Sequence, residues 1–101
     1  MRHIGERLRW VRDALELTQE EIAQKVGDLH QTSWSKYEKG ERSPDQIEVL
    51  RILAKLKISR EYLLGNTLQG VEPELAIRIA AKHPELVFPS DKVPRTGTGQ
   101  P

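Results

Sequence analysis

The side chains best suited to specific chemistry cluster in one short stretch, and that chemistry is hydrogen bonding. Gln31, Thr32, Ser35 and Lys36 point one way if residues 31–37 form a helix. A glutamine amide donates and accepts at once, which suits the N6 and N7 edge of adenine in the major groove of DNA. Thr32 adds a hydroxyl and a methyl group that can contact thymine, and Lys36 can reach guanine O6/N7 or a phosphate. On an arbitrary helix such polar residues are merely exposed to solvent. Whether they bind DNA therefore depends on the helices that position them.

Two short helices joined by a tight turn are predicted to position this polar face. Thr18 is a typical N-cap residue, and Glu21 three residues later completes a capping box. Gly27 ends the first helix, because glycine tolerates positive φ. His30 or Gln31 begins the second. The apolar residues of the first helix recur on one face: Ile22, Ala23 and Val26. Two helices with a glycine-containing turn are typical of a helix-turn-helix DNA reader, and the second would be the recognition helix.

Further helices are predicted on either side of this pair. The helix of residues 4–15 has one apolar stripe, with Arg7, Arg9 and Arg12 off it. The stripe consists of Ile4, Leu8, Val11 and Leu15. Gly40 is predicted to stop the recognition helix, and Pro44 forbids its continuation. Asp45 is then predicted to cap a helix that runs to about residue 57, with Glu48 three residues later. This helix has too many apolar residues for one stripe, so we expect it to be the central, most buried helix.

The C-terminal third is predicted to contain two more helices and a tail. Ser59 caps a short helix that ends at Gly65, with Tyr62, Leu63 and Leu64 facing inward. Residues 66–71 form a linker. Residues 72–83 form a last helix with Pro73 in its first turn. Its narrow apolar stripe is Leu75, Ala76, Ile79 and Ala80, followed by the apolar residues Leu86, Val87 and Phe88. Residues 90–101 have the composition of a disordered segment.

The composition excludes several classes of protein and leaves others open. There is no cysteine among the 101 residues, so disulfides and cysteine-containing zinc sites are excluded. No apolar run approaches a membrane span, and no apolar signal segment begins the chain, so we expect a cytoplasmic protein. The net charge is +1, which by itself argues weakly against DNA binding. What matters is where the charges lie.

The histidines and tryptophans do not suggest a metal site, a catalytic site or base stacking. His3, His30 and His83 are too far apart in sequence to suggest a metal site, and nothing marks a nucleophile or an acid/base pair. We therefore expect no metal, no cofactor and no enzymatic activity. Trp34 pairs with Tyr37 at helical spacing, which favours core packing over base stacking. Trp10 lies off the apolar stripe of its helix, and we expect it to pack under the C-terminal helix.

Residues 4–66 resemble the lambda-repressor/Cro-like family, the xenobiotic-response-element type of helix-turn-helix. The matching stretches occur in order: ERLRWVRDALELTQEEIAQKVG, SWSKYEKGERSP and ISREYLLGN. The resemblance implies an all-α fold of five helices around one core, here with an additional C-terminal helix and a flexible tail. The corresponding parts are residues 1–66, 67–88 and 89–101. One departure is that the stretch from Gly27 to Gly40 is a residue longer than usual, with Asp28 as the extra one.

The resemblance also implies roles for individual residues. Base-facing positions fall on Gln31, Thr32, Ser35 and Lys36. The position that contacts a phosphate and braces the first side chain of the recognition helix is Gln19. Arg12 and Glu38 match a pair that forms a buried salt bridge. The basic side chains expected to meet backbone phosphates are Arg9, Lys39 and Arg42.

Family members bind operator DNA, usually as dimers, so the resemblance implies a sequence-specific transcriptional regulator of bacterial or phage type, associated with the nucleoid through its operator. The expected partner is double-stranded DNA with an inverted repeat. The apolar surfaces considered for a homodimer are Leu63 and Leu64, and the stripe of Leu75 and Ile79 with Leu86 and Val87. The alternative is an antitoxin-type regulator whose residues 72–88 bind a partner protein.

Overall fold

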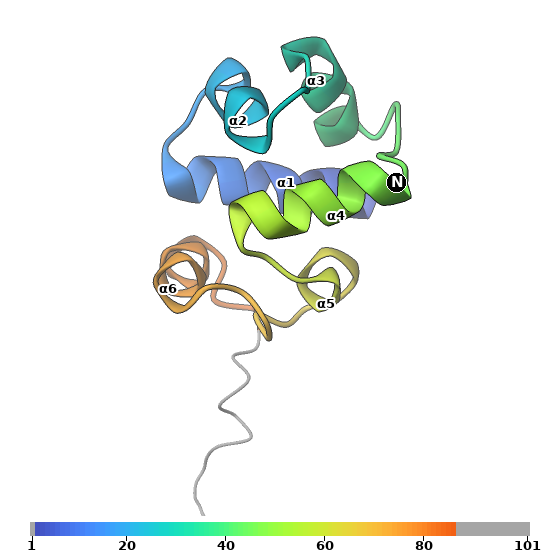
Figure 1. Ribbon diagram of the computed structural model, residues 1–101. Coiled ribbons are helices and arrows are strands. Elements are labelled where there is room, and N and C mark those ends of the chain that lie inside the picture. Colours follow the sequence, from blue (N-terminus) through green and yellow to red (C-terminus); the bar gives the residue numbers. More distant parts are fainter. Residues whose placement is uncertain (1, 87–101) are drawn as a thin grey trace, which may run out of the picture.

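The computed structural model describes residues 2–86 and, for side chains, residues 4–86. Within this range the chain is all-helical, with no strand. Its six helices are α1 (Arg2–Leu15), α2 (Gln19–Val26), α3 (Gln31–Lys39), α4 (Gln46–Leu56), α5 (Arg60–Leu64) and α6 (Pro73–Lys82). Figure 1 shows α2 and α3 at one end of the molecule, α5 and α6 at the other, and α1 and α4 between them. The predicted tail, with Val87 and Phe88, lies outside the described residues.

Local hydrogen bonds explain where the helices begin. The Thr18 hydroxyl accepts from the Glu21 N–H at 3.1 Å, and the Glu21 carboxylate accepts from the Thr18 N–H at 2.8 Å. This is the predicted capping box. Asp45 and Ser59 cap α4 and α5 in the same way, each accepting from the N–H three residues on. Glu72 caps α6, with Pro73 in the first turn. The caps predicted at Thr18, Asp45 and Ser59 are therefore confirmed. The first helix begins at Arg2, two residues before its predicted start.

The central helix is α1 and not α4, which corrects the prediction from sequence. α1 packs against α3, α5 and α6, whereas α4 packs mainly against α2. Leu8 and Val11 on α1 are completely buried. On α4, Ile47 is 69% and Leu50 is 56% exposed. The number of apolar residues on α4 was a poor guide, because only one of its faces, with Ile52 and Leu56, meets the core.

A glycine allows α1 to approach α3 closely. Gly5 is buried, and a Cβ atom added there would lie 2.4 Å from the carbonyl oxygen of Tyr37 and 2.6 Å from that of Glu38. Neither oxygen can move without disturbing the end of α3. Gly5 is therefore required where the central helix passes the recognition helix, a role that the sequence analysis did not identify.

The C-terminal extension completes the same core. Leu75, Ala76 and Ile79 of α6 are buried in one cluster with Leu8 and Val11 of α1. Leu86 is buried in the same cluster. The segment predicted as a linker contributes too, since Leu68 and Val71 are almost fully buried. The apolar stripe of α6 is thus covered by its own chain.

Trp10 joins α1 to the end of α6, as predicted. Its ring stacks on His83 with centroids 3.7 Å apart and planes 15° from parallel. On α1 the guanidinium of Arg7 lies 4.5 Å from the Trp10 ring centroid and 5.8 Å from that of Tyr62. Arg7 lies off the apolar stripe of α1, yet it is only 3% exposed, and it donates to the side chain of Asn66. Aromatic faces attract cations, which helps to explain how a guanidinium is accommodated here.

One inward-facing position of α5 was predicted wrongly. Tyr62 and Leu63 are buried as expected, but Leu64 is 64% exposed. The Tyr62 hydroxyl donates to the Arg7 carbonyl at 2.6 Å, and burial raises the pKa of Tyr62 above its ordinary value. Successive residues of an α-helix are rotated by about 100° from one another, so three consecutive residues cannot all face the same side. Leu64 points away from the core.

Candidate nucleic-acid interface

The turn between α2 and α3 sets where the recognition helix begins. Gly27 has a φ of 93° and Asp28 a φ of 49°, so both adopt backbone conformations that redirect the chain. His30 is the N-cap of α3, and its Nδ1 accepts from the Thr32 N–H at 3.1 Å. Of the two predicted starts, α3 therefore begins at Gln31, and the capping role of His30 is new. This role was not predicted because histidine is an uncommon N-cap residue.

The two sides of α3 differ completely. Trp34 is fully buried and Tyr37 is 3% exposed, with their rings in an edge-on contact. This confirms core packing for Trp34. On the other side, Gln31, Thr32 and Lys36 are exposed and Ser35 is half-buried. The structure therefore places the four predicted base-facing residues together on the outside of a helix that is anchored in the core.

The exposed side of α3 carries no negative charge. The one acidic residue of the helix is Glu38, and its side chain is only 6% exposed. Lys36 and Lys39 lie in the last turn. Arg42 follows the helix and donates to the Ser33 hydroxyl at 3.3 Å, which draws its guanidinium back toward α3. The surface of this helix is thus neutral to basic although the chain as a whole is almost neutral.

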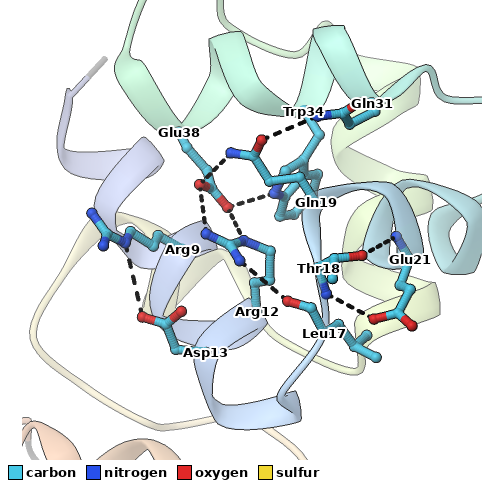
Figure 2. A network of polar contacts seen from close by, with 10 residues as sticks. All are labelled: Arg9, Arg12, Asp13, Leu17, Thr18, Gln19, Glu21, Gln31, Trp34 and Glu38. Atoms are coloured by element: carbon cyan, nitrogen blue, oxygen red, sulfur yellow. Dashed lines mark hydrogen bonds and ion pairs between the residues drawn. The ribbon is translucent and has the colours of Figure 1, made fainter.

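A polar network beneath α3 ties it to α1 and α2 (Figure 2). Arg12 donates through Nε to Glu38 Oε2 at 2.6 Å and through a terminal nitrogen to Glu38 Oε1 at 3.2 Å. Trp34 Nε1 also donates to Glu38 Oε2 at 2.6 Å. Gln19 Nε2 donates to Glu38 Oε1 at 3.0 Å. One buried carboxylate therefore collects donors from three helices.

Gln19 extends this network to the surface. Its Oε1 accepts from Gln31 Nε2 at 3.4 Å (Figure 2). Gln31 is the first residue of α3 and Gln19 the first residue of α2, so their contact links the starts of the two helices. The amide of Gln31 is held from one side and remains exposed on the other.

The network keeps Glu38 ionised. Burial alone would raise the pKa of Glu38, but hydrogen bonds from Arg12, Gln19 and Trp34 and the charge of Arg12 outweigh burial, so the pKa lies below its ordinary value. The hydrogen bond to Glu38 likewise raises the pKa of Arg12. Both partners are charged at neutral pH, and the pair is a salt bridge between α1 and the end of α3.

The predicted phosphate-contacting residues lie on different elements and differ in their exposure. Lys39 and Arg42 are exposed beside α3, and Gln19 is half-buried at the start of α2. The Arg9 side chain, on α1, is 65% exposed and lies 3.9 Å from the Asp13 carboxylate. Such a loose surface pair is worth little and leaves Arg9 free to exchange partners. Contact of these four residues with phosphates stays a prediction.

Other kinds of site find little support in the described part of the chain. The side chains of residues 4–86 include no group of three histidine or acidic residues that could hold a metal ion. None of the helices described is both long and apolar enough to cross a membrane.

Comparison with known proteins agrees with the geometry. A family model described as helix-turn-helix matches residues 8–63, more than half of the chain. The chain is also 36% identical over 76 residues to the cryptic phage CTXphi transcriptional repressor RstR of Vibrio cholerae serotype O1. The aligned residues make up 75% of this chain and 67% of that repressor. No solved structure matches significantly. The chain belongs to the helix-turn-helix family, in its lambda-repressor/Cro-like branch of DNA-binding transcription regulators.

Proposed function

We propose that this protein is a repressor that binds its operator as a homodimer and reads the major groove with α3. The observation that carries the proposal is the two-sided character of α3. One side is fixed in the core by Trp34 and Tyr37, while the other exposes hydrogen-bonding and basic groups and no carboxylate. An α-helix fits the major groove, where each base pair presents a distinct pattern of donors and acceptors.

Within this proposal, the residues of α3 divide into readers and anchors. Gln31 and Thr32 lie at the N-terminal end, where recognition helices contact base edges. Lys36 reaches a guanine or a phosphate farther along the groove. The phosphate anchors are Lys39 and Arg42 beside α3, Arg9 on α1, and Gln19 together with the free backbone N–H groups at the start of α2. Repression is supported by the similarity to a protein named as a transcriptional repressor.

A homodimer follows from the small number of base contacts. About four side chains at roughly 1–3 kcal/mol each cannot select one site in a genome. Two identical subunits related by a two-fold axis double the contacts, and the operator becomes an inverted repeat. The half-sites are then about one DNA turn apart, roughly 34 Å centre to centre.

The dimer surface must come from apolar side chains that the core leaves free. Leu63, Leu75, Ile79 and Leu86, which the sequence suggested, are buried within the chain. The larger apolar side chains that are exposed among the described residues are Ile47, Leu50, Leu64 and Ile77. Ile47 and Leu50 lie on α4 and Leu64 on α5. Leu64 lines a cavity of about 270 Å³, together with Gln46 and Val49, which are the sequence neighbours of Ile47 and Leu50 on α4. We propose this α4–α5 surface for self-association.

We favour the homodimeric repressor over the antitoxin alternative. It requires residues 72–88 to offer an apolar stripe to a second protein. Leu75, Ala76 and Ile79 of that stripe are buried against the chain's own core, and Ile77 alone among the larger apolar side chains of α6 remains exposed. We therefore propose no second function.

Two variants test the reading of bases. Gln31→Ala should weaken binding to the cognate site by about 1–3 kcal/mol and relax preference at one base pair. Arg9→Ala should weaken binding to all sequences alike and lower the slope of log K against log[salt] by about one. Titration of labelled duplexes at several salt concentrations measures both. If Gln31→Ala weakens random DNA as much as the operator, Gln31 is not a base reader.

A matched pair of isoleucine variants tests the dimer surface. Ile47→Glu on α4 should shift the protein toward the monomer in sedimentation velocity, because it places a charge in the proposed interface. Ile77→Glu is the control, since Ile77 is similarly exposed, 63% against 69%, but lies on α6. If Ile77→Glu dissociates the dimer and Ile47→Glu does not, the surface has been assigned to the wrong helices.

A further inference from the structure

The buried carboxylate of Glu38 determines which way round two glutamine amides lie. The nitrogen and oxygen of a glutamine amide are similar in shape, so only hydrogen-bond partners decide its orientation. An ionised carboxylate can only accept hydrogen bonds. Glu38 Oε1 lies 3.0 Å from the Gln19 amide, so the NH₂ group of Gln19 must face Glu38. The Gln19 carbonyl oxygen then points toward α3.

The same constraint passes to Gln31. The Gln19 oxygen is an acceptor, so the amide group of Gln31 that lies 3.4 Å away must be its NH₂. One N–H of Gln31 is used in this contact. The other N–H and the carbonyl oxygen remain on the exposed side. A donor and an acceptor side by side match the N7 acceptor and N6 donor of adenine.

The opposite orientation would give Gln31 a different preference. If Gln31 turned its oxygen toward Gln19, its NH₂ group would present two donors to the DNA. Two donors suit the O6 and N7 acceptors of guanine better than they suit adenine. The base that Gln31 prefers therefore depends on the orientation of Gln19, and that orientation depends on Glu38.

We propose that Glu38 is a positioning residue for specificity, which acts through Gln19 to present Gln31 to adenine rather than guanine. This inference rests on the proposed function, because it requires Gln31 to read a base. It assigns the Arg12–Glu38 salt bridge a second task besides joining α1 to α3. Arg12 neutralises the carboxylate, Trp34 Nε1 also donates to it, and the carboxylate orders the amides.

The geometry makes Glu38→Gln the sharpest test. Glu38 Oε2 accepts from both Arg12 Nε and Trp34 Nε1 at 2.6 Å, so the amide oxygen of the variant takes this place. Its NH₂ group then takes the place of Oε1 and meets the Gln19 NH₂. Two donors cannot bond, so Gln19 turns over and Gln31 turns with it. The variant is expected to lose its preference for adenine at one position of each half-site and to accept guanine there.

The measurement uses the full chain and a duplex selected from random DNA by the wild-type protein. Dissociation constants are measured for this duplex and for its single base-pair substitutions at every position. A bidentate contact discriminates against a wrong base by roughly 5- to 150-fold. The ratio of guanine to adenine dissociation constants at the Gln31 position should fall at least about fivefold in Glu38→Gln. The ratio compares two duplexes on one protein, so a uniform loss of folded protein cancels.

Two further variants separate amide orientation from general damage. Arg12→Met breaks the same salt bridge but leaves a carboxylate to accept from Gln19, so it should keep the wild-type ratio. Gln19→Met keeps the salt bridge but removes the link to Gln31, so it should lose discrimination at the same base pair. Gln19→Met also tests the proposal if Glu38→Gln does not fold.

The outcomes are distinct. If Glu38→Gln and Gln19→Met both retain the wild-type ratio while Gln31→Ala loses it, the proposed link is overturned and base reading stands. If Arg12→Met relaxes the ratio as much as Glu38→Gln, the effect comes from the lost salt bridge and the proposal is again overturned. If Gln31→Ala changes preference at no position, base reading by Gln31 itself fails, and the role of Glu38 fails with it.

Discussion

Ile79→Ala tests whether α6 is an integral part of the folded domain. Ile79 is completely buried in the cluster that α6 shares with α1. The change removes three carbon atoms, worth about 0.8 kcal/mol each in lost transfer free energy, or roughly 2.4 kcal/mol. A cavity adds to this, so the expected loss in the free energy of unfolding is about 2–5 kcal/mol. That is a large part of the roughly 5–15 kcal/mol typical of a domain.

Ile77→Ala is the matched control for this prediction. It makes the same chemical change two residues away on the same helix, where the side chain is 63% exposed. Both variants gain the same few tenths of a kcal/mol in helix propensity, so this contribution cancels in the comparison. A surface change of this kind is usually worth less than about 0.5 kcal/mol in either direction.

Urea unfolding followed by circular dichroism measures both variants, at several protein concentrations. We expect one cooperative transition, whose midpoint falls markedly for Ile79→Ala and hardly at all for Ile77→Ala. Equal and small effects would show that α6 does not stabilise the domain. A loss for Ile79→Ala that appears only as a stronger dependence on protein concentration would show that α6 packs on a partner subunit instead.

Three other predictions concern the junction of α1 and α3. Removing either partner of the Arg12–Glu38 pair alone should cost up to about 3–5 kcal/mol in unfolding free energy, and a double-mutant cycle with coupling near zero would contradict the salt bridge. Folding lowers the pKa of Glu38, so the contribution of this carboxylate to stability is present above its ordinary pKa of 4.5 and is lost as the pH falls below it. The free energy of unfolding, measured as the pH is lowered below 4.5, should therefore decrease less in Glu38→Gln than in the wild type. Gly5→Ala should lower the free energy of unfolding by about 1–3 kcal/mol, because the new Cβ would overlap the Tyr37 carbonyl. Helix propensity alone predicts that this substitution raises the free energy of unfolding. The sign of the measured change therefore distinguishes the close contact from helix propensity.

Features that depend on neighbouring residues were predictable from the sequence. The capping box at Thr18, the cap at Asp45 and the stop at Gly40 are set within a few residues of chain, and all three occur as expected. The polar side of α3 follows in the same way, because the burial of Trp34 and Tyr37 determines which residues are left outside.

Features that depend on what covers a helix were not predictable. The apolar residues of α4 suggested a central helix, yet no pattern within α4 could show that nothing covers Ile47 and Leu50. Leu68 was assigned to a linker, although it is almost fully buried. The need for glycine at position 5 was not predicted either, because it comes from close contact with the backbone of α3, more than thirty residues away in the sequence.

Two copies of α3 are proposed to read an inverted repeat in the major groove. Selection of bound sequences from random duplex DNA, followed by footprinting of the winner, tests it most directly. We expect two half-sites of opposite orientation about one DNA turn apart, roughly 34 Å, with protected major-groove positions on one face of the duplex. A selected site without two-fold symmetry, or no enrichment over random DNA, would contradict the proposed reading of an operator by a homodimer.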